Sequence, residues 1–253
     1  MSEPAKSEAE GILQLRHQAE EAFHDRKYAE NENEPAHYRL GPTLRVFLRL
    51  KERLGDIRDR NVLEYGCGSG WVTADLAALG AKVDAFDISR EAVANTKVYL
   101  AERGLNACCN IRKMSAEQCD YPDNRFDVVV GFAILHHLDL EKALAELHRM
   151  LKPGGVALFA EPLGSNPLLN LYRQLTPQYR TPDERPLVLR EFAGQARMFG
   201  DFRHEEFYLT AMAPLLLGMR KGFDLCSRLD RAILRRFPEA GRWAWYSLLE
   251  LRK

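Results

Sequence analysis

Two histidines and a glutamate are the side chains best suited to proton transfer. His136 and His137 follow the apolar run "RFDVVVGF", and Glu161 closes the apolar run "VALFAEP". If both runs are parallel strands, their carboxyl ends meet at one edge of a sheet, where ligands bind. A histidine beside a carboxylate is oriented and kept basic near neutral pH. We therefore predict His137, His136 and Glu161 as catalytic residues; the alternatives are a structural histidine and a glutamate that caps backbone amides.

A glycine-rich loop, "EYGCGSGW", follows the first apolar run and predicts a ligand that approaches the backbone closely. Its spacing is Gly66-x-Gly68-x-Gly70, and Trp71 stands where the third glycine of the dinucleotide pattern would be. Glu64 precedes the loop and would repel a pyrophosphate, whereas it suits an ammonium or sulfonium group. The loop therefore favours a cationic ligand over a dinucleotide.

The second predicted strand, "KVDAFDIS", places Asp87 at its carboxyl end. An acidic residue in this place accepts hydrogen bonds from the hydroxyls of a ribose. A ligand that combines a ribose with a cationic group and has no phosphate fits S-adenosylmethionine.

Strands and helices alternate between residues 61 and 162. Strands are expected over 61–66, 82–89, 107–114, 125–132 and 156–162; helices are expected over 72–80, 90–104 and 140–151, with "KPGG" (152–155) as a turn. Continuous apolar strands between helices indicate a parallel sheet that is covered on both faces.

The two ends of the chain have a different pattern. Helices are predicted over 8–30 and 42–54, and beyond residue 162 a strand over 204–212, a helix over 213–236 and a closing strand over 243–253. Arg173 lies in a segment rich in Pro, Arg and Tyr; it could face the pocket and bind an acidic acceptor, or the segment could be a fixed turn. The basic helix 220–236 is predicted to be a cap, with a membrane-surface helix as the alternative.

Composition narrows the class of protein. The 253 residues include 36 basic and 36 acidic ones, so there is no basic excess of the kind that nucleic-acid binders show. The five cysteines have no C-x-x-C spacing, and we expect neither disulfides nor a metal site. Neither a signal peptide nor a membrane-spanning run is expected. These features predict a cytoplasmic protein that does not bind nucleic acid; peripheral membrane contact stays open, and the oligomeric state is not predicted.

Over residues 60–162 the chain resembles the class I S-adenosylmethionine-dependent methyltransferases, in particular small-molecule enzymes related to quinone biosynthesis and natural products. The resemblance is carried by "VLEYGCGSG", "VDAFDIS", "MSAEQCDYPDNRFDVVV", "GFAILHHL" and "LKPGG" in that order. It implies a doubly wound, Rossmann-like α/β fold. The sheet would have seven mostly parallel strands and an antiparallel final strand, with N-terminal helices and a helical cap near the C-terminus.

The resemblance also implies roles for single residues. The glycines admit the methionine and ribose portions, Glu64 lies near the amino group, Asp87 holds the ribose, and the carbonyl of Phe132 meets the ammonium. The implied cofactor-binding residues are Glu64, Gly66, Cys67, Gly68, Gly70, Asp87, Ile88, Met114, Ala116, Glu117 and Phe132. Residues 1–56 would form a helical lid with His24, Tyr28 and Tyr38 near the substrate. Residues 57–162 would be the cofactor-binding core, and residues 163–253 the substrate cap with the last two strands.

The expected activity is methyl transfer to an oxygen or nitrogen of a small molecule, because a His/Glu pair is available as a base. A carbon acceptor and a lipid or quinone-type acceptor are the nearest alternatives. An NAD(P)-dependent oxidoreductase and a non-catalytic protein that retains the fold are more distant ones.

Overall fold

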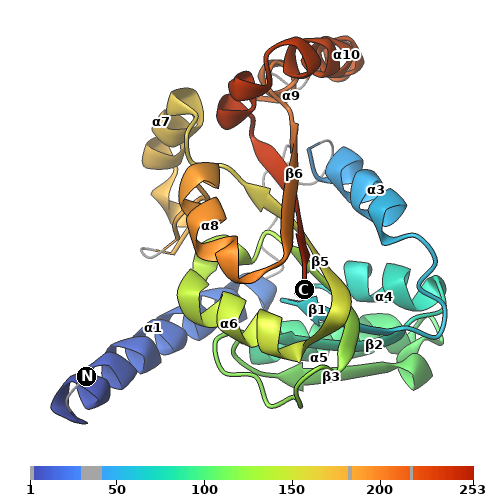
Figure 1. Ribbon diagram of the computed structural model, residues 1–253, viewed down its shortest axis with the longest axis vertical. Coiled ribbons are helices and arrows are strands. Elements are labelled where there is room, and N and C mark those ends of the chain that lie inside the picture. Colours follow the sequence, from blue (N-terminus) through green and yellow to red (C-terminus); the bar gives the residue numbers. More distant parts are fainter. Residues whose placement is uncertain (1–2, 30–41, 182–183, 217–218) are drawn as a thin grey trace.

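A computed structural model gives the structure of the chain and describes residues 3–29, 42–181, 184–216 and 219–253. The described residues form a seven-stranded sheet of order β3-β2-β1-β4-β5-β7-β6. Its strands are β1 (Asn61–Tyr65), β2 (Lys82–Asp87), β3 (Cys109–Lys113), β4 (Phe126–Phe132), β5 (Leu151–Pro162), β6 (Asp201–Phe207) and β7 (Tyr246–Arg252). The first five strands are parallel, and β7 runs antiparallel to β5 and β6, so the predicted doubly wound fold is confirmed (Figure 1).

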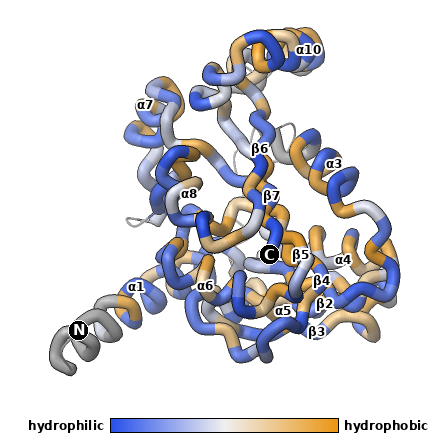
Figure 2. The backbone as a smooth tube through the Cα atoms, in the orientation of Figure 1, coloured by the Kyte–Doolittle hydropathy of each residue, from blue (hydrophilic) through white to orange (hydrophobic). Residues whose placement is uncertain are grey.

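Helices cover both faces of this sheet. They are α1 (Glu3–Ala29), α3 (Pro42–Leu54), α4 (Trp71–Ala78), α5 (Arg90–Ala101), α6 (Leu140–Met150), α7 (Pro167–Leu175), α8 (Leu189–Gln195), α9 (Met212–Leu216) and α10 (Arg220–Arg236). Successive strand residues point to opposite faces, so Val62 packs in the core under α3 and α4, whereas Leu63 packs in the core under α6 and α8. Because both faces are buried at the centre of the sheet, the central strands are mainly hydrophobic, as Figure 2 shows, whereas the edge strand β6 is polar.

Two details differ from the sequence prediction. The predicted turn at residues 152–155 belongs to β5, which pairs with β4 through a bulge: Leu151 lies opposite Phe126, and the next pair is Val156 with Val128. The helices α7 and α8 were not predicted. The start of α7 has a clear signal, since the Asn166 side chain accepts hydrogen bonds from two backbone amides and Pro167 takes the first position.

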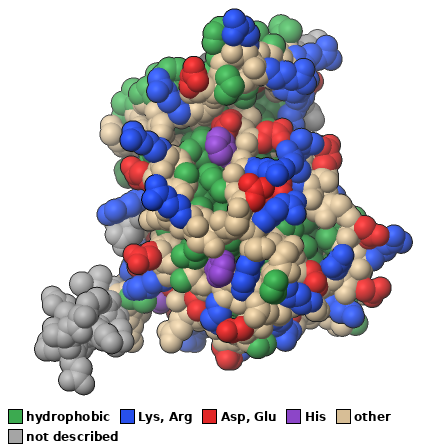
Figure 3. Space-filling model, in the orientation of Figure 1, with side chains coloured by type: hydrophobic (Ala, Val, Ile, Leu, Met, Phe, Trp, Pro, Cys, Tyr) green, Lys and Arg blue, Asp and Glu red, His purple; other side chains and the backbone are tan. Residues whose placement is uncertain are grey.

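The predicted helix over 213–236 corresponds to α9 and α10, separated by residues 217–219, of which 217 and 218 lie outside the described part of the chain. On α10, Asp230 faces inward and accepts hydrogen bonds from the amides of Leu209 and Thr210. Leu225 and Leu229 are 71% and 49% exposed, and Figure 3 shows basic and hydrophobic side chains together at this end of the molecule. Within the described residues, no helix combines the length and the apolar character needed to cross a membrane.

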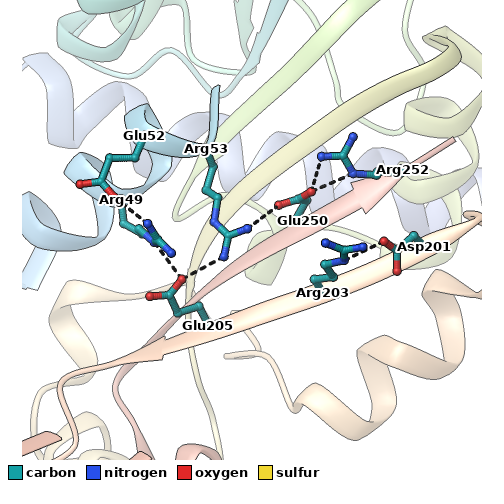
Figure 4. Close-up of polar contacts among 8 residues, drawn as sticks. All are labelled: Arg49, Glu52, Arg53, Asp201, Arg203, Glu205, Glu250 and Arg252. Carbon is teal, nitrogen blue, oxygen red and sulfur yellow. Dashed lines mark hydrogen bonds and ion pairs between the residues drawn. The ribbon is translucent and has the colours of Figure 1, made fainter. Parts of the chain in front are cut away.

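A network of ion pairs joins α3 to the antiparallel edge of the sheet (Figure 4). Arg49 Nε lies 2.9 Å from Glu205 Oε2, and Arg53 lies 3.3 Å from the same oxygen. Glu250, a buried residue of β7, accepts a hydrogen bond from Arg252 at 2.6 Å and lies 3.5 Å from Arg53. The network fixes α3 against β6 and β7.

Replacing Glu250 should weaken the fold measurably. Glu250→Gln keeps the size of this buried side chain and removes its charge, so we expect the free energy of unfolding to fall by about 1–2 kcal/mol. The exposed pair Arg203–Asp201 is the matched control, and Asp201→Asn should change stability by less than about 0.5 kcal/mol. Urea denaturation of both variants measures the difference. Equal effects would contradict a special role for the buried carboxylate.

Candidate functional site

A cavity lies at the carboxyl ends of β1, β2 and β4, under the C-terminal half of α1. Its lining residues are Arg16, His17, Glu20, His24, Tyr28, Gly66, Phe86, Asp87, Ile88, Met114, Ser115, Ala116, Glu117, Phe132, Ala133, Ile134, His137 and Leu138. Parallel strands that diverge around a ligand place it at this edge of the sheet. The predicted ligand site therefore corresponds to an actual cavity.

The glycine loop between β1 and α4 has the backbone that the sequence predicts. Gly66, Gly68 and Gly70 have φ values of 70°, 49° and 83°, which are left-handed conformations that favour glycine. A Cβ on Gly70 would lie 3.0 Å from the Thr96 Cα on α5. The loop is thus both left-handed and closely packed against α5.

Crowding at Gly70 gives a testable difference between two left-handed glycines. A Cβ on Gly104 (φ 67°) would meet no atom within 4 Å. Gly104→Ala should therefore cost about 1 kcal/mol, from backbone strain alone. Gly70→Ala also has to displace the backbone of α5, so we expect about 2 kcal/mol. Urea unfolding of the two variants compares them directly, and an equal loss would show that packing against Thr96 is unimportant.

Asp87 connects the glycine loop to the end of β2. Its Oδ2 accepts a hydrogen bond from the Gly68 amide at 3.0 Å, and its Oδ1 accepts one from the Ser89 amide at 2.9 Å. Burial raises the pKa of Asp87. Each oxygen has a second lone pair, so the carboxylate can still accept hydrogen bonds from a ligand in the cavity.

Glu64 is a buried carboxyl at the end of β1. Its Oε2 accepts a hydrogen bond from the Thr73 hydroxyl at 2.5 Å, and burial raises its pKa to about 8. Glu64, Cys67, Gly68 and Gly70 are cofactor-binding predictions that do not appear in the cavity lining, although Gly66 of the same loop does. Their predicted contacts with a cofactor stay predictions.

The predicted adenine-binding residues Met114, Ala116 and Glu117 all line the cavity, as do Ile88 and Phe132. Ile88 directly follows β2, and Phe132 is the last residue of β4. Five cofactor-binding predictions from separate strands and loops therefore meet at one place.

Glu117 has partners that the sequence prediction missed. Its buried carboxylate contacts Arg16 and His17 of α1 and accepts a hydrogen bond from the Asp139 amide at 2.6 Å. Arg16 and His17 precede Glu117 by 101 and 100 residues, and only the docking of α1 brings them here. The spacing of apolar residues along α1 does not indicate that Arg16 and His17 face Glu117.

Polar contacts hold α1 over the cavity. Asp25 accepts a hydrogen bond from the Ser89 hydroxyl at 2.6 Å, and the Tyr28 carbonyl accepts one from Asn95 at 3.2 Å. Lys113 pairs with Glu21 at 2.6 Å. The C-terminal half of α1 lies next to α5, whereas its N-terminal end extends away from the sheet (Figure 1).

The predicted lid residues His24 and Tyr28 line the cavity, while Tyr38 lies outside the described residues. A Cβ on Gly68 would lie 2.7 Å from the Tyr28 hydroxyl, so Tyr28 covers the middle of the glycine loop. The division of the chain into a lid, a core and a cap stays a prediction.

His137 is the predicted catalytic residue that lines the cavity. Its Nδ1 lies 3.5 Å from Oε2 of Glu20, and the same oxygen lies 3.3 Å from Nε2 of His24. Burial lowers the pKa of His137. Burial acts against ionisation of Glu20, yet His137 and His24 lower the pKa of that carboxyl overall. Glu20 was not predicted, although its four-residue spacing from His24 places both on one helix face.

His136 and Glu161 form a buried pair behind the cavity lining. His136 Nδ1 lies 2.8 Å from Glu161 Oε2, while Oε1 of Glu161 accepts hydrogen bonds from the amides of Ile134 and Leu135, both at 2.9 Å. Burial lowers the pKa of His136 to about 3 and raises that of Glu161 to about 7. The pair fixes the segment after β4 that carries His137, and a direct catalytic role for either residue stays a prediction.

Arg173 is buried in α7 and does not appear in the cavity lining. Its Nη1 donates hydrogen bonds to the Leu163 carbonyl at 3.0 Å and to Asn170 Oδ1 at 2.8 Å. These contacts hold α7 against the end of β5. A role in binding an acidic acceptor stays a prediction.

The fold is a Rossmann-like α/β sheet with a cavity at the carboxyl ends of its parallel strands. Residues 63–159 match the family model described as "Methyltransferase domain". The chain is 30% identical over 128 residues to a ubiquinone biosynthesis O-methyltransferase of Alkalilimnicola ehrlichii, a match that covers 50% of this chain and 51% of the relative. The chain thus spans about half the length of the curated relatives it matches.

Two solved structures share the fold at low sequence identity. Phosphoethanolamine N-methyltransferase 2 of Haemonchus contortus superimposes with a TM-score of 0.63 at 19% identity, covering 81% of this chain and 51% of that one. Geranyl diphosphate C-methyltransferase of Streptomyces coelicolor A3(2) superimposes with a TM-score of 0.59 at 15% identity, covering 83% and 78%. The predicted resemblance is supported: residues 63–159 match the methyltransferase domain model, and the solved structures share the Rossmann-like fold of this chain.

Proposed function

We propose that this protein transfers a methyl group from S-adenosylmethionine to an oxygen or nitrogen atom of a small organic molecule of secondary metabolism. The observation that carries the proposal is the convergence of predicted cofactor-binding residues on one cavity. Those that line it are Gly66, Asp87, Ile88, Met114, Ala116, Glu117 and Phe132. They come from four strands, β1 to β4, and the loops after them, so chance grouping of unrelated residues is a poor explanation.

The residues at the cavity fit the chemical parts of this ligand. Asp87 has lone pairs available for ribose hydroxyls, and Ile88 and Met114 offer apolar surface for a flat base. The glycine loop lets a ligand approach the backbone closely. Glu64 lies two residues before Gly66 and, once ionised, would favour a cationic amino-acid end.

Methyl transfer from a sulfonium requires alignment more than acid or base strength, because the leaving group is already activated. Alignment in a closed site supplies roughly 7–11 kcal/mol of the barrier. The contacts of α1 with α5 and with Glu117 would keep the reacting atoms in place and limit access of water. A hydroxyl or amine acceptor must also lose a proton, and the polar cluster of His137, His24 and Glu20 lies on the wall of the same cavity.

A quinone-type phenol is the second candidate acceptor. Its support is the name of the curated relatives, ubiquinone biosynthesis O-methyltransferases, which match this chain at about 30% identity. The matched part covers about half of each chain, so it supports the cofactor domain more than the pocket for the acceptor. A carbon acceptor has the support of the fold likeness alone.

Calorimetry with the full chain tests the cofactor. We expect micromolar binding of S-adenosylhomocysteine and none of NADH at submillimolar concentration. Binding of NADH without S-adenosylhomocysteine would overturn the proposal in favour of an oxidoreductase. Incubation with S-adenosylmethionine and a panel of phenols, amines and carbon acids, followed by mass spectrometry, then identifies the acceptor atom. Methylation of carbon acids alone would overturn the assignment to a heteroatom.

A further inference from the structure

Three possible metal ligands converge on the cavity wall, and the methyltransferase fold does not account for them. Glu20 and His24 come from α1, and His137 comes from the short helix η2 (Leu135–His137) after β4. One ligand atom from each lies within 4.8 Å of the other two. Glu20 and His24 are four residues apart, so one face of α1 presents both side chains toward η2.

The spacing of these atoms is too long for strong hydrogen bonds and suits a shared ion. Oε2 of Glu20 lies 3.3 Å from Nε2 of His24 and 3.5 Å from Nδ1 of His137. Around a tetrahedral zinc ion with bonds of about 2.0–2.1 Å, neighbouring ligand atoms are roughly 3.3–3.4 Å apart. The two measured separations are close to that value.

The hydrogen-bond pattern of the cluster points the same way. Both carboxylate oxygens of Glu20 and Nδ1 of His137 are buried and have no hydrogen-bond partner among the described residues. Buried polar atoms almost always have partners, because leaving one unpaired costs about 1–3 kcal/mol. A bound cation between these atoms would satisfy all of them at once.

The set of ligands also has the composition of a catalytic centre. Two histidines and one carboxylate bind zinc in several hydrolases and leave a fourth position for water or substrate. All three residues line the cavity, so the fourth position would face the space in front of them. A second group, His136, His137 and Glu184, shares His137, but Nδ1 of His136 is already engaged by Glu161.

We propose that Glu20, His24 and His137 bind one Zn²⁺ ion, or a similar divalent transition metal, on the wall of the cavity. The cysteine pattern gave no sign of such a site, because its ligands are distant in sequence and meet only when α1 docks. The site would fasten α1 to the segment after β4. Because all three ligands belong to the protein, the metal would bind whether or not an acceptor is present.

The catalytic consequence rests on the proposed function. An acceptor hydroxyl bound at the fourth position of the ion would have a lowered pKa, so the acceptor would lose its proton to water near neutral pH. The acceptor oxygen then forms a bond to the methyl carbon while the sulfur–carbon bond breaks and its electron pair stays on sulfur. The three side chains would act as ligands, and none of them would have to take up the proton.

Metal binding can be measured separately from catalysis. The full chain is stripped with a chelator and titrated with Zn²⁺ by calorimetry, and Co²⁺ is added in a parallel sample. We expect one equivalent of Zn²⁺ to bind and Co²⁺ to give the strong visible absorption of a four-coordinate ion. His24→Ala and Glu20→Gln should each weaken Zn²⁺ binding roughly 100-fold. His204→Ala, which removes a histidine from β6, should leave it unchanged.

Three outcomes would overturn the site. The first is that the wild-type chain does not bind Zn²⁺, and the second is a weak six-coordinate Co²⁺ spectrum. The third is that Glu184→Gln loses Zn²⁺ binding while Glu20→Gln keeps it. The wild-type Co²⁺ spectrum decides the question even if a variant fails to fold. Binding of S-adenosylhomocysteine is measured on the same samples. If the chain binds S-adenosylhomocysteine but no Zn²⁺, only the metal site is contradicted. If it binds Zn²⁺ but no S-adenosylhomocysteine, only the proposed function is contradicted.

Discussion

Asp87→Asn should weaken binding of S-adenosylhomocysteine roughly 100-fold. The substitution replaces a carboxylate that lines the cavity with an amide, which has one accepting oxygen in place of two. Hydrogen bonds to a charged acceptor contribute about 1.5–3 kcal/mol each, so loss of one or two accounts for a change of this size. The amide also cannot accept from both Gly68 and Ser89, so the glycine loop loses one of its supports.

Asp84→Asn is the matched control for Asp87→Asn. Asp84 lies on the same strand and is also buried, but its carboxylate accepts from Asn110 at 2.6 Å and pairs with Arg125 at 2.8 Å, away from the cavity lining. We expect this variant to lose some stability and to keep its affinity for S-adenosylhomocysteine. Calorimetry measures both variants. Equal affinity of the two would show that Asp87 does not contact the ligand.

The sequence predicted the sheet and half of the site because both depend on local patterns. Apolar runs between helices are enough to place five parallel strands, and parallel strands bring their carboxyl ends to one edge. Asp87, Ile88 and Phe132 therefore fall at the cavity without any knowledge of side-chain packing. The two final strands were also predicted, although β6 begins and ends earlier than expected.

The other half of the site depends on how α1 docks, which no local pattern determines. Arg16, His17 and Glu20 look like solvated residues of an amphipathic helix, and they reach the cavity only because α1 packs against α5. For the same reason, the sequence placed Glu161 at the same sheet edge as His136 and His137 but did not indicate which of them it would contact. The structure pairs Glu161 with His136, and it places Glu20 of α1 beside His137.

Buried charge is the second property that the sequence could not reveal. Glu64 on β1 and Glu250 on β7 are both buried glutamates of one sheet. Glu250 has Arg53 and Arg252 as partners, whereas the contact of Glu64 is the Thr73 hydroxyl. This difference in partners predicts opposite effects of the same Glu→Gln substitution.

Glu64→Gln should stabilise the unliganded protein at high pH, whereas Glu250→Gln destabilises it. Burial raises the pKa of Glu64 to about 8 from its ordinary value near 4.5. Between these two values the folded state holds a proton that the unfolded state has lost, so stability falls as pH rises through this window. Gln keeps the hydrogen bond from Thr73 without any proton to lose. We expect the variant to exceed the wild type by on the order of 3 kcal/mol at pH 9, and by less than about 1 kcal/mol at pH 5.

Urea unfolding of the wild type, Glu64→Gln and Glu250→Gln at pH 5, 7 and 9 measures this effect. A constant difference between Glu64→Gln and the wild type would mean that Glu64 does not titrate in this range. Glu64→Gln should weaken ligand binding even though it raises stability, because an ionised Glu64 favours the ammonium of the ligand. Wild-type affinity for S-adenosylhomocysteine should rise with pH up to about 8. In Glu64→Gln it should be roughly tenfold weaker and independent of pH over the same range. If stability responds and affinity does not, Glu64 is a buried acid of the fold that has no contact with the amino-acid end of the ligand.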